Sequence, residues 1–393
     1  MAAISQQTER LLGSIGGLAR FALDSPLVEG MKRPGISDFV FGNPHDLAMP
    51  EYVDVLSRAV QPTGPDHYAY KMSEPYATQA IAESLRARFG VAFQPDDVFM
   101  TNGNFAGLTM AVRAVADPGD EVVFVSPPWF FYETLILSTG ATPVRVYADR
   151  ETFDLDLDAI AGAITPRTRA VIVNSPNNPS GRIYSPETLD SLAAVLGEAS
   201  ERIGRPVYLL SDEAYNRVVF DDREFPTPVT RYPHSFLLYT YAKTLLAPGS
   251  RLGYIAMPPD MPEREDFRTA LLVGAMATGW AFPVSVLQYA VPELEALAFD
   301  VKVLQARRDR LVPALREQGY RALEPEGTFY ILVRSPIEDD LAFCESLANH
   351  DVFVLPGSLF EMPGWFRISV TANDGMVEKG IPGFAAAMAG ANA

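Results

Sequence analysis

A lysine in apolar surroundings is the first residue of this sequence whose type and position suggest chemistry. Lys243 lies just after the strand-like run Phe236–Thr240. Burial lowers the pKa of a lysine and favours the neutral, nucleophilic amine. A lone lysine is more often a surface residue whose stem lies along the protein. Here, however, Thr240 stands three positions before the lysine and Arg251 eight positions after it, which supplies a hydroxyl and a guanidinium suited to binding a phosphate.

Asp212 is the second such residue, because it places a carboxylate at the end of an apolar run. It follows Leu209, Leu210 and Ser211, which have the character of a buried strand. A carboxylate in that position is costly unless it is paired. The same residue type also caps helix N termini. On this segment alone both interpretations are open.

Two further loops contain glycine and asparagine, and the second of them, which also contains proline, follows a strand-like run. In Thr101–Gly107, Gly103 precedes a helical pattern, and backbone N–H groups at a helix N terminus bind phosphate readily. In Asn174–Gly181, two prolines and a glycine favour a rigid turn that would fix the direction of the Asn178 amide. Each loop alone is weak evidence of function, because such residues are frequent in ordinary turns.

The order of these motifs resembles that of the fold-type-I, class I and II aminotransferases, the aspartate-aminotransferase-like family that uses pyridoxal 5′-phosphate. The pattern that carries the resemblance is Thr240, Lys243, Arg251 and then a glycine two residues further on. Seven motifs in the same order extend it from about Phe41 to Arg367, most of the chain. The resemblance implies a pyridoxal-phosphate-dependent aminotransferase that moves the amino group of an L-amino acid to a 2-oxo acid.

The resemblance assigns catalytic roles to three residues. Lys243 is expected to form the Schiff base with pyridoxal 5′-phosphate and then to act as general base at the substrate Cα. Asp212 is expected to pair with the pyridine nitrogen and keep it protonated, so that the ring accepts electrons. Tyr215 is expected to donate a hydrogen bond to the phenolic oxygen O3′ of the cofactor, at which the Asn178 amide is also aimed.

Further contacts follow from the same resemblance. Trp129 is expected to stack on the cofactor ring, although a lone tryptophan is equally well a core residue. Arg367 is expected to bind the substrate α-carboxylate through a bidentate contact, with Asn178 and Gly42 in the same substrate site. The phosphate is expected to be bound by Gly103, Asn104, Phe105, Thr240, Arg251 and, from a neighbouring subunit, Tyr68. This last contact implies a homodimer with shared active sites.

The sequence departs from the family pattern in three places. Ser73 stands where relatives usually carry glycine, and Ala242 replaces a frequent serine before the lysine. The stretch Ala275–Pro283 contains no arginine, whereas dicarboxylate-specific relatives carry one in the corresponding region. Trp280 and Phe282 in that stretch indicate an apolar pocket for the substrate side chain.

Two other functions compete with transamination. An oxidase, cyclase, lyase or racemase of secondary metabolism would need the same Lys243, Asp212 and Arg367, so the sequence leaves this alternative open. A regulator with an aminotransferase-like domain would need a DNA-binding module and a basic face. Only about forty residues precede the first motif and the net charge is -17, which argues against it.

Strand-like runs alternate with helical patterns from Pro95 to Tyr254, which predicts an α/β fold with a mostly parallel sheet. The expected strands are Glu121–Val125, Pro143–Val146, Ala170–Asn174, Val207–Ser211, Phe236–Thr240 and Gly253–Ala256, and the expected helices Gly107–Val115 and Pro186–Arg202. After Pro283 we expect a smaller α+β layer with a long helix, three strands and two further helices: Leu287–Gln318; Thr328–Val333, Val352–Leu355 and Phe366–Val370; Asp339–His350 and Gly375–Met388.

These elements predict a fold-type-I pyridoxal-phosphate transferase. Residues 1–45 would form an N-terminal segment packing on the small domain. Residues 46–284 would form the large cofactor-binding domain, and residues 285–393 the small C-terminal domain.

Charge and composition limit the partners. The net charge of -17 argues against nucleic acid, and the four histidines show no metal-ligand spacing, so no metal site is expected. The single cysteine, Cys344, suits a core position in a reducing compartment. Residues 11–19 are apolar but lack a clean signal-peptide cleavage site, and no run is expected to be long enough to span a bilayer. A cytoplasmic enzyme acting on small molecules is therefore expected.

Overall fold

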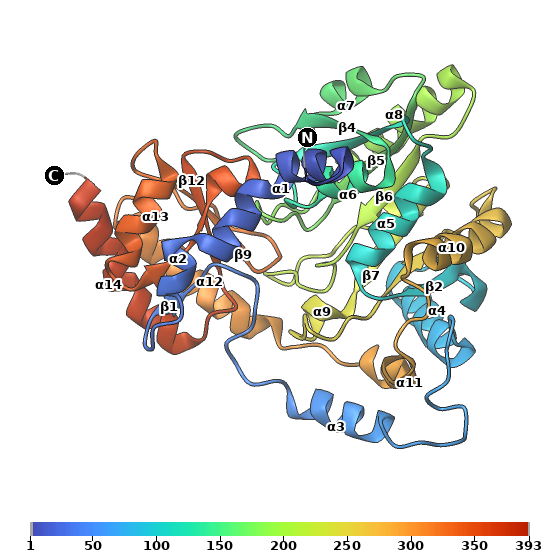
Figure 1. The fold of residues 1–393 in the computed structure, drawn as a ribbon, viewed down its shortest axis with the longest axis horizontal. Helices are drawn as coiled ribbons and strands as arrows, with labels where there is room; N and C mark the ends of the chain where they lie inside the picture. Colours follow the sequence, from blue (N-terminus) through green and yellow to red (C-terminus); the bar gives the residue numbers. More distant parts are fainter. Residues whose placement is uncertain (1–2, 392–393) are drawn as a thin grey trace.

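The computed structural model describes residues 3–391, which form a large region around one sheet and a smaller region toward the C terminus (Figure 1). The large sheet has the strand order β2-β8-β7-β6-β5-β3-β4. Neighbouring strands are parallel except at β8, which is antiparallel to both β2 and β7. Its strands are β2 (Val98–Thr101), β3 (Glu121–Ser126), β4 (Thr142–Tyr147), β5 (Thr168–Asn174), β6 (Tyr208–Asp212), β7 (Ser235–Thr240) and β8 (Gly253–Ala256). The predicted α/β class and mostly parallel sheet are confirmed.

Helices cover both faces of this sheet, which explains why its strands read as continuous apolar runs. In β7, Phe236 and Leu238 pack with helices α5, α6 and α10, whereas Leu237 packs on the other face with α3, α4 and α11. Helices α7 and α8 cover the rest of that second face. The helices are α3 (Pro50–Ala59), α4 (Pro75–Phe89), α5 (Asn104–Val115), α6 (Tyr132–Thr139), α7 (Leu157–Ala163), α8 (Pro186–Ile203), α10 (Arg264–Thr278) and α11 (Ser285–Leu294).

The smaller region has its own core around a three-stranded antiparallel sheet of order β11-β12-β9. Its strands are β9 (Tyr330–Arg334), β11 (Leu355–Pro356) and β12 (Trp365–Ser369), and its helices α12 (Val301–Glu317), α13 (Asp340–Ala348) and α14 (Asp374–Ala391). A two-residue strand from the N-terminal segment, β1 (Ser37–Asp38), pairs in parallel with β10 (Val352–Phe353). The N-terminal segment therefore contributes to the smaller region, while the domain limits at residues 45 and 284 stay a prediction.

Two element predictions were wrong. The helix expected over Leu287–Gln318 is divided into α11 and α12, because the Phe299 amide donates to the Thr244 carbonyl and the Asp300 side chain accepts from the Lys302 amide to start a new helix. The strand expected over Val352–Leu355 is divided into β10 and β11, which belong to different sheets. Short strand β2 was not predicted.

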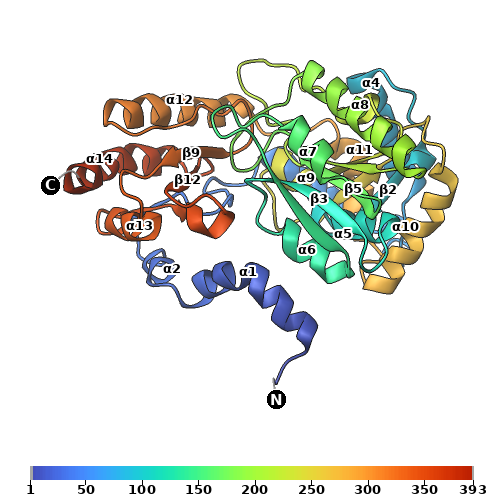
Figure 2. The ribbon, with the colours of Figure 1, turned by 90° about the horizontal axis from the view of Figure 1, so that it is seen from above.

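The N terminus forms a helix that the sequence analysis did not predict, α1 (Gln6–Asp24), followed by α2 (Pro26–Gly30). Helix α1 lies against α6, where the Ser14 and Thr134 hydroxyls are 2.8 Å apart, and extends away from the smaller region (Figure 2). Contrary to expectation, Gln6–Gly30 is long and apolar enough to cross a membrane by length and composition alone. That is weak evidence, because core helices and signal sequences meet the same criterion.

Candidate active site

A cavity of about 230 Å³ lies where the carboxyl ends of the central strands face the smaller region. Asp212 ends β6 and Thr240 ends β7, and parallel strands bring such terminal residues to one edge of the sheet. The cavity lining includes these residues that the sequence singled out: Gly42, Asn104, Phe105, Trp129, Asn178, Asp212, Tyr215, Thr240, Lys243, Arg251 and Arg367.

Asp212 is a buried carboxylate without a cationic partner. Its side chain is 4% exposed and accepts hydrogen bonds from Asn104 Nδ2 (2.7 Å), Tyr132 Oη (2.5 Å) and the Ala214 amide (3.2 Å). Within residues 3–391 it forms no salt bridge. Burial raises the pKa of Asp212 to about 6, although these donors and the charge of Lys243 lower it. The protein thus holds an acid in place with neutral donors, which leaves its charge available to a cationic group in the cavity.

Lys243 belongs to a short helix, α9 (Tyr241–Thr244), that starts directly after β7. The Thr240 hydroxyl accepts from the Ala242 amide and so caps this helix. Lys243 Nζ lies 5.5 Å from the centre of the Tyr215 ring and 5.8 Å from that of Phe329. An amine in these aromatic surroundings projects into the cavity rather than into solvent.

Close backbone packing at one end of the cavity depends on two glycines. A Cβ at Gly103, which has φ 83°, would lie 2.9 Å from a guanidinium nitrogen of Arg251. A Cβ at Gly253 would lie 2.4 Å from the Tyr239 carbonyl oxygen. Gly103 itself does not line the cavity, but it begins α5, whose N terminus has no capping side chain. The uncapped amides of α5 and the Arg251 guanidinium together make an end suited to an anion. The Thr240 hydroxyl lies at the same end and donates to the Leu252 carbonyl (3.1 Å) in this structure.

Arg367 is a buried cation without an acidic partner. It is 2% exposed, donates from Nη1 to Asn178 Oδ1 (2.9 Å) and from Nη2 to the Val40 carbonyl (3.3 Å), and its Nε has no hydrogen-bond partner. No acidic side chain of residues 3–391 forms a salt bridge with it. Burial lowers the pKa of this guanidinium. A desolvated guanidinium of this kind is suited to binding a carboxylate that enters the cavity.

The structure does not bring Tyr68 to the cavity of its own chain. Tyr68 is 60% exposed, and its hydroxyl donates to the Val60 carbonyl. Conversely, sequence reasoning missed Tyr132, which bonds Asp212, and Tyr330, which stacks on Arg367. Tyr132 stands in the same Pro127–Tyr132 segment as Trp129, so a polar aromatic residue at the start of a helix was the available signal. Tyr330 is one residue of a predicted apolar strand, and nothing local distinguishes it.

Comparisons with known proteins agree with this architecture. A family model described as aminotransferase class I and II matches residues 43–382. An aspartate/prephenate aminotransferase of Thermus thermophilus is 31% identical over 382 residues, which cover 93% of this chain and 95% of that protein. An aspartate aminotransferase of Thermotoga maritima is 32% identical over 314 residues, or 76% of this chain and 78% of that protein.

Solved structures show the same similarity. The crystal structure of an amino transferase from Eubacterium rectale has a TM-score of 0.87 at 30% identity and covers 100% of this chain and 97% of its own. Aspartate aminotransferase from Thermus thermophilus with maleate has a TM-score of 0.83 at 28% identity, with 98% of this chain and 100% of the other covered.

Proposed function

Because the chain belongs to the class I and II aminotransferase family, we propose that the cavity between the large sheet and the smaller region is its active site. The protein is a pyridoxal-5′-phosphate-dependent aminotransferase, which transfers the amino group of an amino acid to a 2-oxo acid. One observation supports the location most directly. A single cavity holds a buried acid without a cation, Asp212, a buried cation without an acid, Arg367, and an amine, Lys243.

The residues of this cavity fit the cofactor. Its pyridine nitrogen, when protonated, is a cation that matches the unpaired Asp212 carboxylate. Its phosphate matches the uncapped N terminus of α5 together with Thr240 and Arg251. Its aldehyde requires an amine, and among residues 3–391 Lys243 is the only lysine that lines the cavity.

The remaining cofactor contacts come from residues around these anchors. The amides of Gly103, Asn104 and Phe105 would bind the phosphate, and Trp129 would pack on the ring. The Asn178 amide nitrogen and the Tyr215 hydroxyl would donate to O3′. Asn178 Oδ1 is already held by Arg367, which leaves its Nδ2 free to donate in the other direction.

The chain's own groups then divide the chemistry between them. When bound, the cofactor supplies a ring that accepts the electrons released at the substrate Cα. Arg367, with Asn178 and Gly42 beside it, binds the substrate α-carboxylate and so fixes the orientation of Cα. Lys243 Nζ would take the proton from the substrate Cα as general base. Asp212 would hold a proton on the pyridine nitrogen.

The function is tested by following the cofactor and the amino group together. Purified protein is expected to be yellow, to lose that absorbance on borohydride treatment and to carry the reduced adduct on Lys243 in peptide mapping. Lys243→Ala should lose the covalent adduct. An adduct on another lysine would overturn the assignment.

The same preparation separates transamination from other reactions of the cofactor. With an amino donor present, release of a keto acid should require 2-oxoglutarate or pyruvate as acceptor. Keto acid or ammonia released without any acceptor would instead indicate the oxidase or lyase alternative, and loss of optical activity alone would indicate a racemase.

We further infer a two-fold homodimer in which Tyr68 reaches the cofactor phosphate of the partner. Exposed aromatic and apolar side chains surround Tyr68 and the anion end of the cavity, and Tyr70 and Phe282 form a pair with ring centres 4.8 Å apart. A second hollow lined by Asn102, Phe105, Arg251, Trp280 and Val284 continues this surface. An apolar surface of this kind favours burial against a second copy.

The shared site is tested by mixing subunits. In a heterodimer of wild type with Tyr68→Ala/Lys243→Ala, the wild-type subunit keeps its lysine but lacks the tyrosine from its partner. Such heterodimers should therefore hold no fully native site and lose activity relative to wild-type dimers. A fully active monomer in light scattering would refute the shared site.

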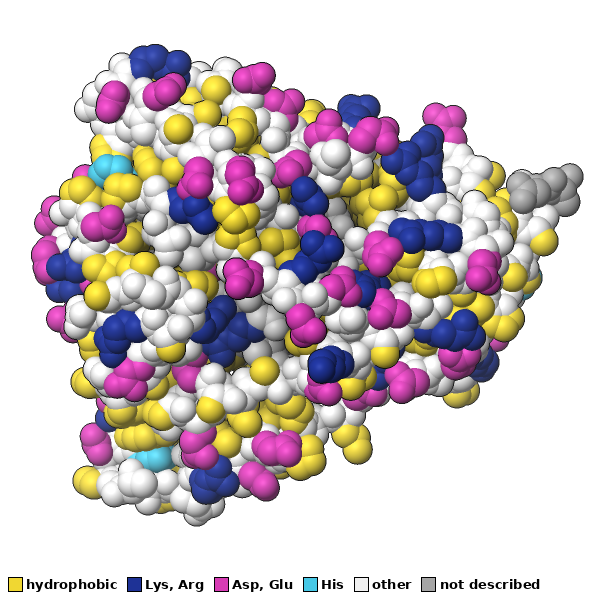
Figure 3. Space-filling model, turned by 180° about the vertical axis from the view of Figure 1, so that it is seen from behind, with side chains coloured by type: hydrophobic (Ala, Val, Ile, Leu, Met, Phe, Trp, Pro, Cys, Tyr) yellow, Lys and Arg dark blue, Asp and Glu magenta, His cyan; other side chains and the backbone are white. Residues whose placement is uncertain are grey.

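We also propose that the protein is cytoplasmic and that it has no nucleic-acid partner. The net charge is -17, and on the face shown in Figure 3 acidic side chains are interspersed among basic ones. The single cysteine, Cys344, is buried. With this charge distribution, the purified protein is expected to bind DNA at most weakly at low salt, with no dependence on the DNA sequence.

A further inference from the structure

The guanidinium of Arg367 lies on the ring of Tyr330. The Arg367 Cζ atom is 3.8 Å from the centre of that ring, compared with 5.8 Å for Phe360 and 5.9 Å for Phe130. Tyr330 is itself 4% exposed. Hydrogen bonds hold Nη1 and Nη2 of Arg367, while Nε has no partner, and the Tyr330 ring is the aromatic surface nearest to the face of the guanidinium.

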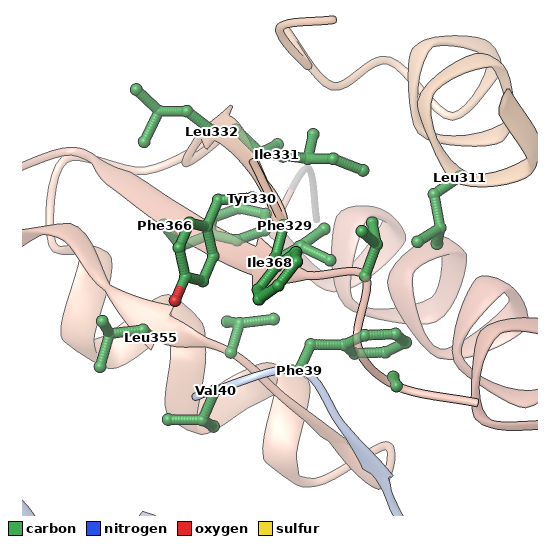
Figure 4. Packing of buried hydrophobic residues seen from close by; sticks show 14 of the residues in the cluster. Phe39, Val40, Leu311, Phe329, Tyr330, Ile331, Leu332, Leu355, Phe366 and Ile368 are labelled. Atoms are coloured by element: carbon green, nitrogen blue, oxygen red, sulfur yellow. The ribbon is translucent and has the colours of Figure 1, made fainter. Parts of the chain in front are cut away.

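The strand register produces this stacking. Strands β9 and β12 are antiparallel, with Tyr330 opposite Ser369 and Leu332 opposite Arg367. Residue 330 is therefore the diagonal neighbour of residue 367, and side chains in a diagonal pair share one face of the sheet. Figure 4 shows the Tyr330 ring leaving β9 on the side opposite to Ile331. The backbone thus places the ring under the guanidinium before any ligand binds.

Gly42 makes room for the Tyr330 hydroxyl. A Cβ at residue 42 would lie 2.4 Å from Tyr330 Oη and 3.3 Å from its Cζ. Gly42 is not among the glycines with positive φ, so its backbone conformation is open to other residues. Space, rather than conformation, therefore explains glycine at this position.

The hydroxyl also connects Arg367 to the lysine side of the cavity. Tyr215 donates to Tyr330 Oη at 3.5 Å, and Tyr215 carries the ring over which Lys243 Nζ lies. Burial raises the pKa of Tyr330, but the charges of Arg367 and Lys243 outweigh it and lower the pKa overall. The single hydroxyl proton of Tyr215 is donated to Tyr330 in this structure and would turn to O3′ when the cofactor is bound, so the support that Tyr330 gives to Arg367 comes from its ring.

From these contacts we propose that Tyr330 is a positioning residue, which orients Arg367 for the substrate carboxylate, and that Gly42 is required to admit its hydroxyl. The proposal rests on the proposed function, because it assumes that Arg367 binds that carboxylate. Tyr330 acts through Arg367 and is not itself a catalytic residue.

The first test removes the ring or the hydroxyl separately. The probe is 3-phenylpropanoate, a carboxylate without an amino group, titrated into the cofactor-loaded enzyme and followed by calorimetry; 3-phenylpropanamide, which has no carboxylate, is the matched control. Tyr330→Leu should weaken binding of the acid about tenfold or more and leave the amide unaffected. Tyr330→Phe, which keeps the ring, should lose at most about threefold.

Kinetics give a second readout of the same variants. Loss of carboxylate orientation in the ground state should raise KM for the amino donor more than it lowers kcat. A general packing defect would instead weaken acid and amide alike. Tyr330→Met, of similar volume to leucine but unbranched, replaces Tyr330→Leu if that variant does not fold.

The second test is a rescue between two segments distant in sequence. Gly42→Ala should weaken 3-phenylpropanoate binding about tenfold by pushing the Tyr330 ring away. In Gly42→Ala/Tyr330→Phe the hydroxyl that clashes is gone, so much of the affinity should return, although the 3.3 Å contact with Cζ prevents full recovery. A double variant as weak as Gly42→Ala would overturn the proposal for Gly42.

The positioning role of Tyr330 and the proposed function can fail separately, and different measurements show which of them has failed. If wild type carries its adduct on Lys243 and transfers amino groups, but Tyr330→Leu binds the acid as tightly as wild type, only the positioning role is overturned. If wild type forms no Lys243 adduct, the function itself fails.

Discussion

The two ends of the cavity are built differently. At the sheet end, defined by Asp212, Thr240, Lys243 and Arg251, every residue lies at or just beyond a strand of the one large sheet. At the closing end, defined by Phe41, Tyr330 and Arg367, the residues come from segments far apart in sequence that meet in the smaller region. The sheet end is therefore set by local geometry, and the closing end by how separate segments pack together.

Two buried side chains, one at each end, carry opposite charges that form no salt bridge among residues 3–391. Asp212 is surrounded by the neutral donors Asn104, Tyr132 and the Ala214 amide. Arg367 contacts the neutral acceptors Asn178 and the Val40 carbonyl. Leaving a buried charge without a counter-ion is costly, so each of these two side chains is suited to a ligand group of the opposite sign. Variants at each end should therefore produce different losses.

The largest effect is expected at the sheet end. Asp212→Ala should keep the phosphate contacts but lose turnover by about a thousandfold or more, because an unprotonated pyridine accepts electrons poorly. Single-turnover kinetics on the cofactor-loaded variant measure this loss. Near-normal turnover would mean that Asp212 only caps the helical turn that follows it. The sheet end would then have no buried acid with a role in the reaction.

The next effect is a pH-dependent stability difference in cofactor-free protein. Asp212 has its pKa raised from 3.8 to about 6 by burial, so the folded state binds its proton more tightly than the unfolded state. Its contribution to stability is thus greatest below about pH 4 and is lost as pH rises to about 6. Asp212→Asn, which cannot ionise, should gain about 3 kcal/mol relative to wild type across this window.

Urea unfolding of both proteins at pH 4.5, 5.5 and 7.5 measures this gain, and the cofactor-loaded pair is the control. A cationic pyridine beside Asp212 offsets the cost of its charge, so the loaded pair should not show the same trend. Glu213, whose pKa burial raises to about 7, is present in both proteins and cancels from the difference. A gain that does not change with pH would contradict an ionised, buried Asp212.

The contrast between the ends also explains what the sequence predicted. Asp212 and Lys243 each follow an apolar run that indicates a buried strand. Their positions at the same edge of the sheet could therefore be inferred from the residues next to them in sequence. The contact between Gly42 and Tyr330 joins residues 288 positions apart in sequence, and no local pattern encodes it. Likewise, the break between α11 and α12 depends on the hydrogen bond from Phe299 to Thr244, which exists only once the large region is folded.

At the closing end, the expected loss is in binding. Arg367→Gln removes the charge and should lower kcat/KM for the amino donor about a hundredfold, mainly through KM, because a buried charge-assisted pair is worth several kcal/mol. Arg367→Lys is the matched control. It keeps the positive charge but not the bidentate geometry of the guanidinium, so its kcat/KM should lie between those of Arg367→Gln and wild type. The cofactor spectrum should stay unchanged in both variants, and loss of the cofactor from Arg367→Gln would show that the two ends are not independent.

The smallest effect concerns the substrate side chain, for which the closing end offers aromatic surface. Among residues 3–391 the cations that line the cavity are Lys243, Arg251 and Arg367, and each already has a proposed partner. A second carboxylate on the donor would therefore lie beside Phe41 and Phe130 without a cation from this chain, which is unfavourable. We expect a neutral or aromatic L-amino acid to be preferred, although relatives are named for aspartate.

The measurement is kcat/KM for aspartate, phenylalanine, alanine and arginine at saturating acceptor. Phenylalanine or alanine should exceed aspartate by about tenfold, equivalent to about 1.4 kcal/mol; aspartate leading by that margin would mean that a cation from the partner subunit completes the closing end.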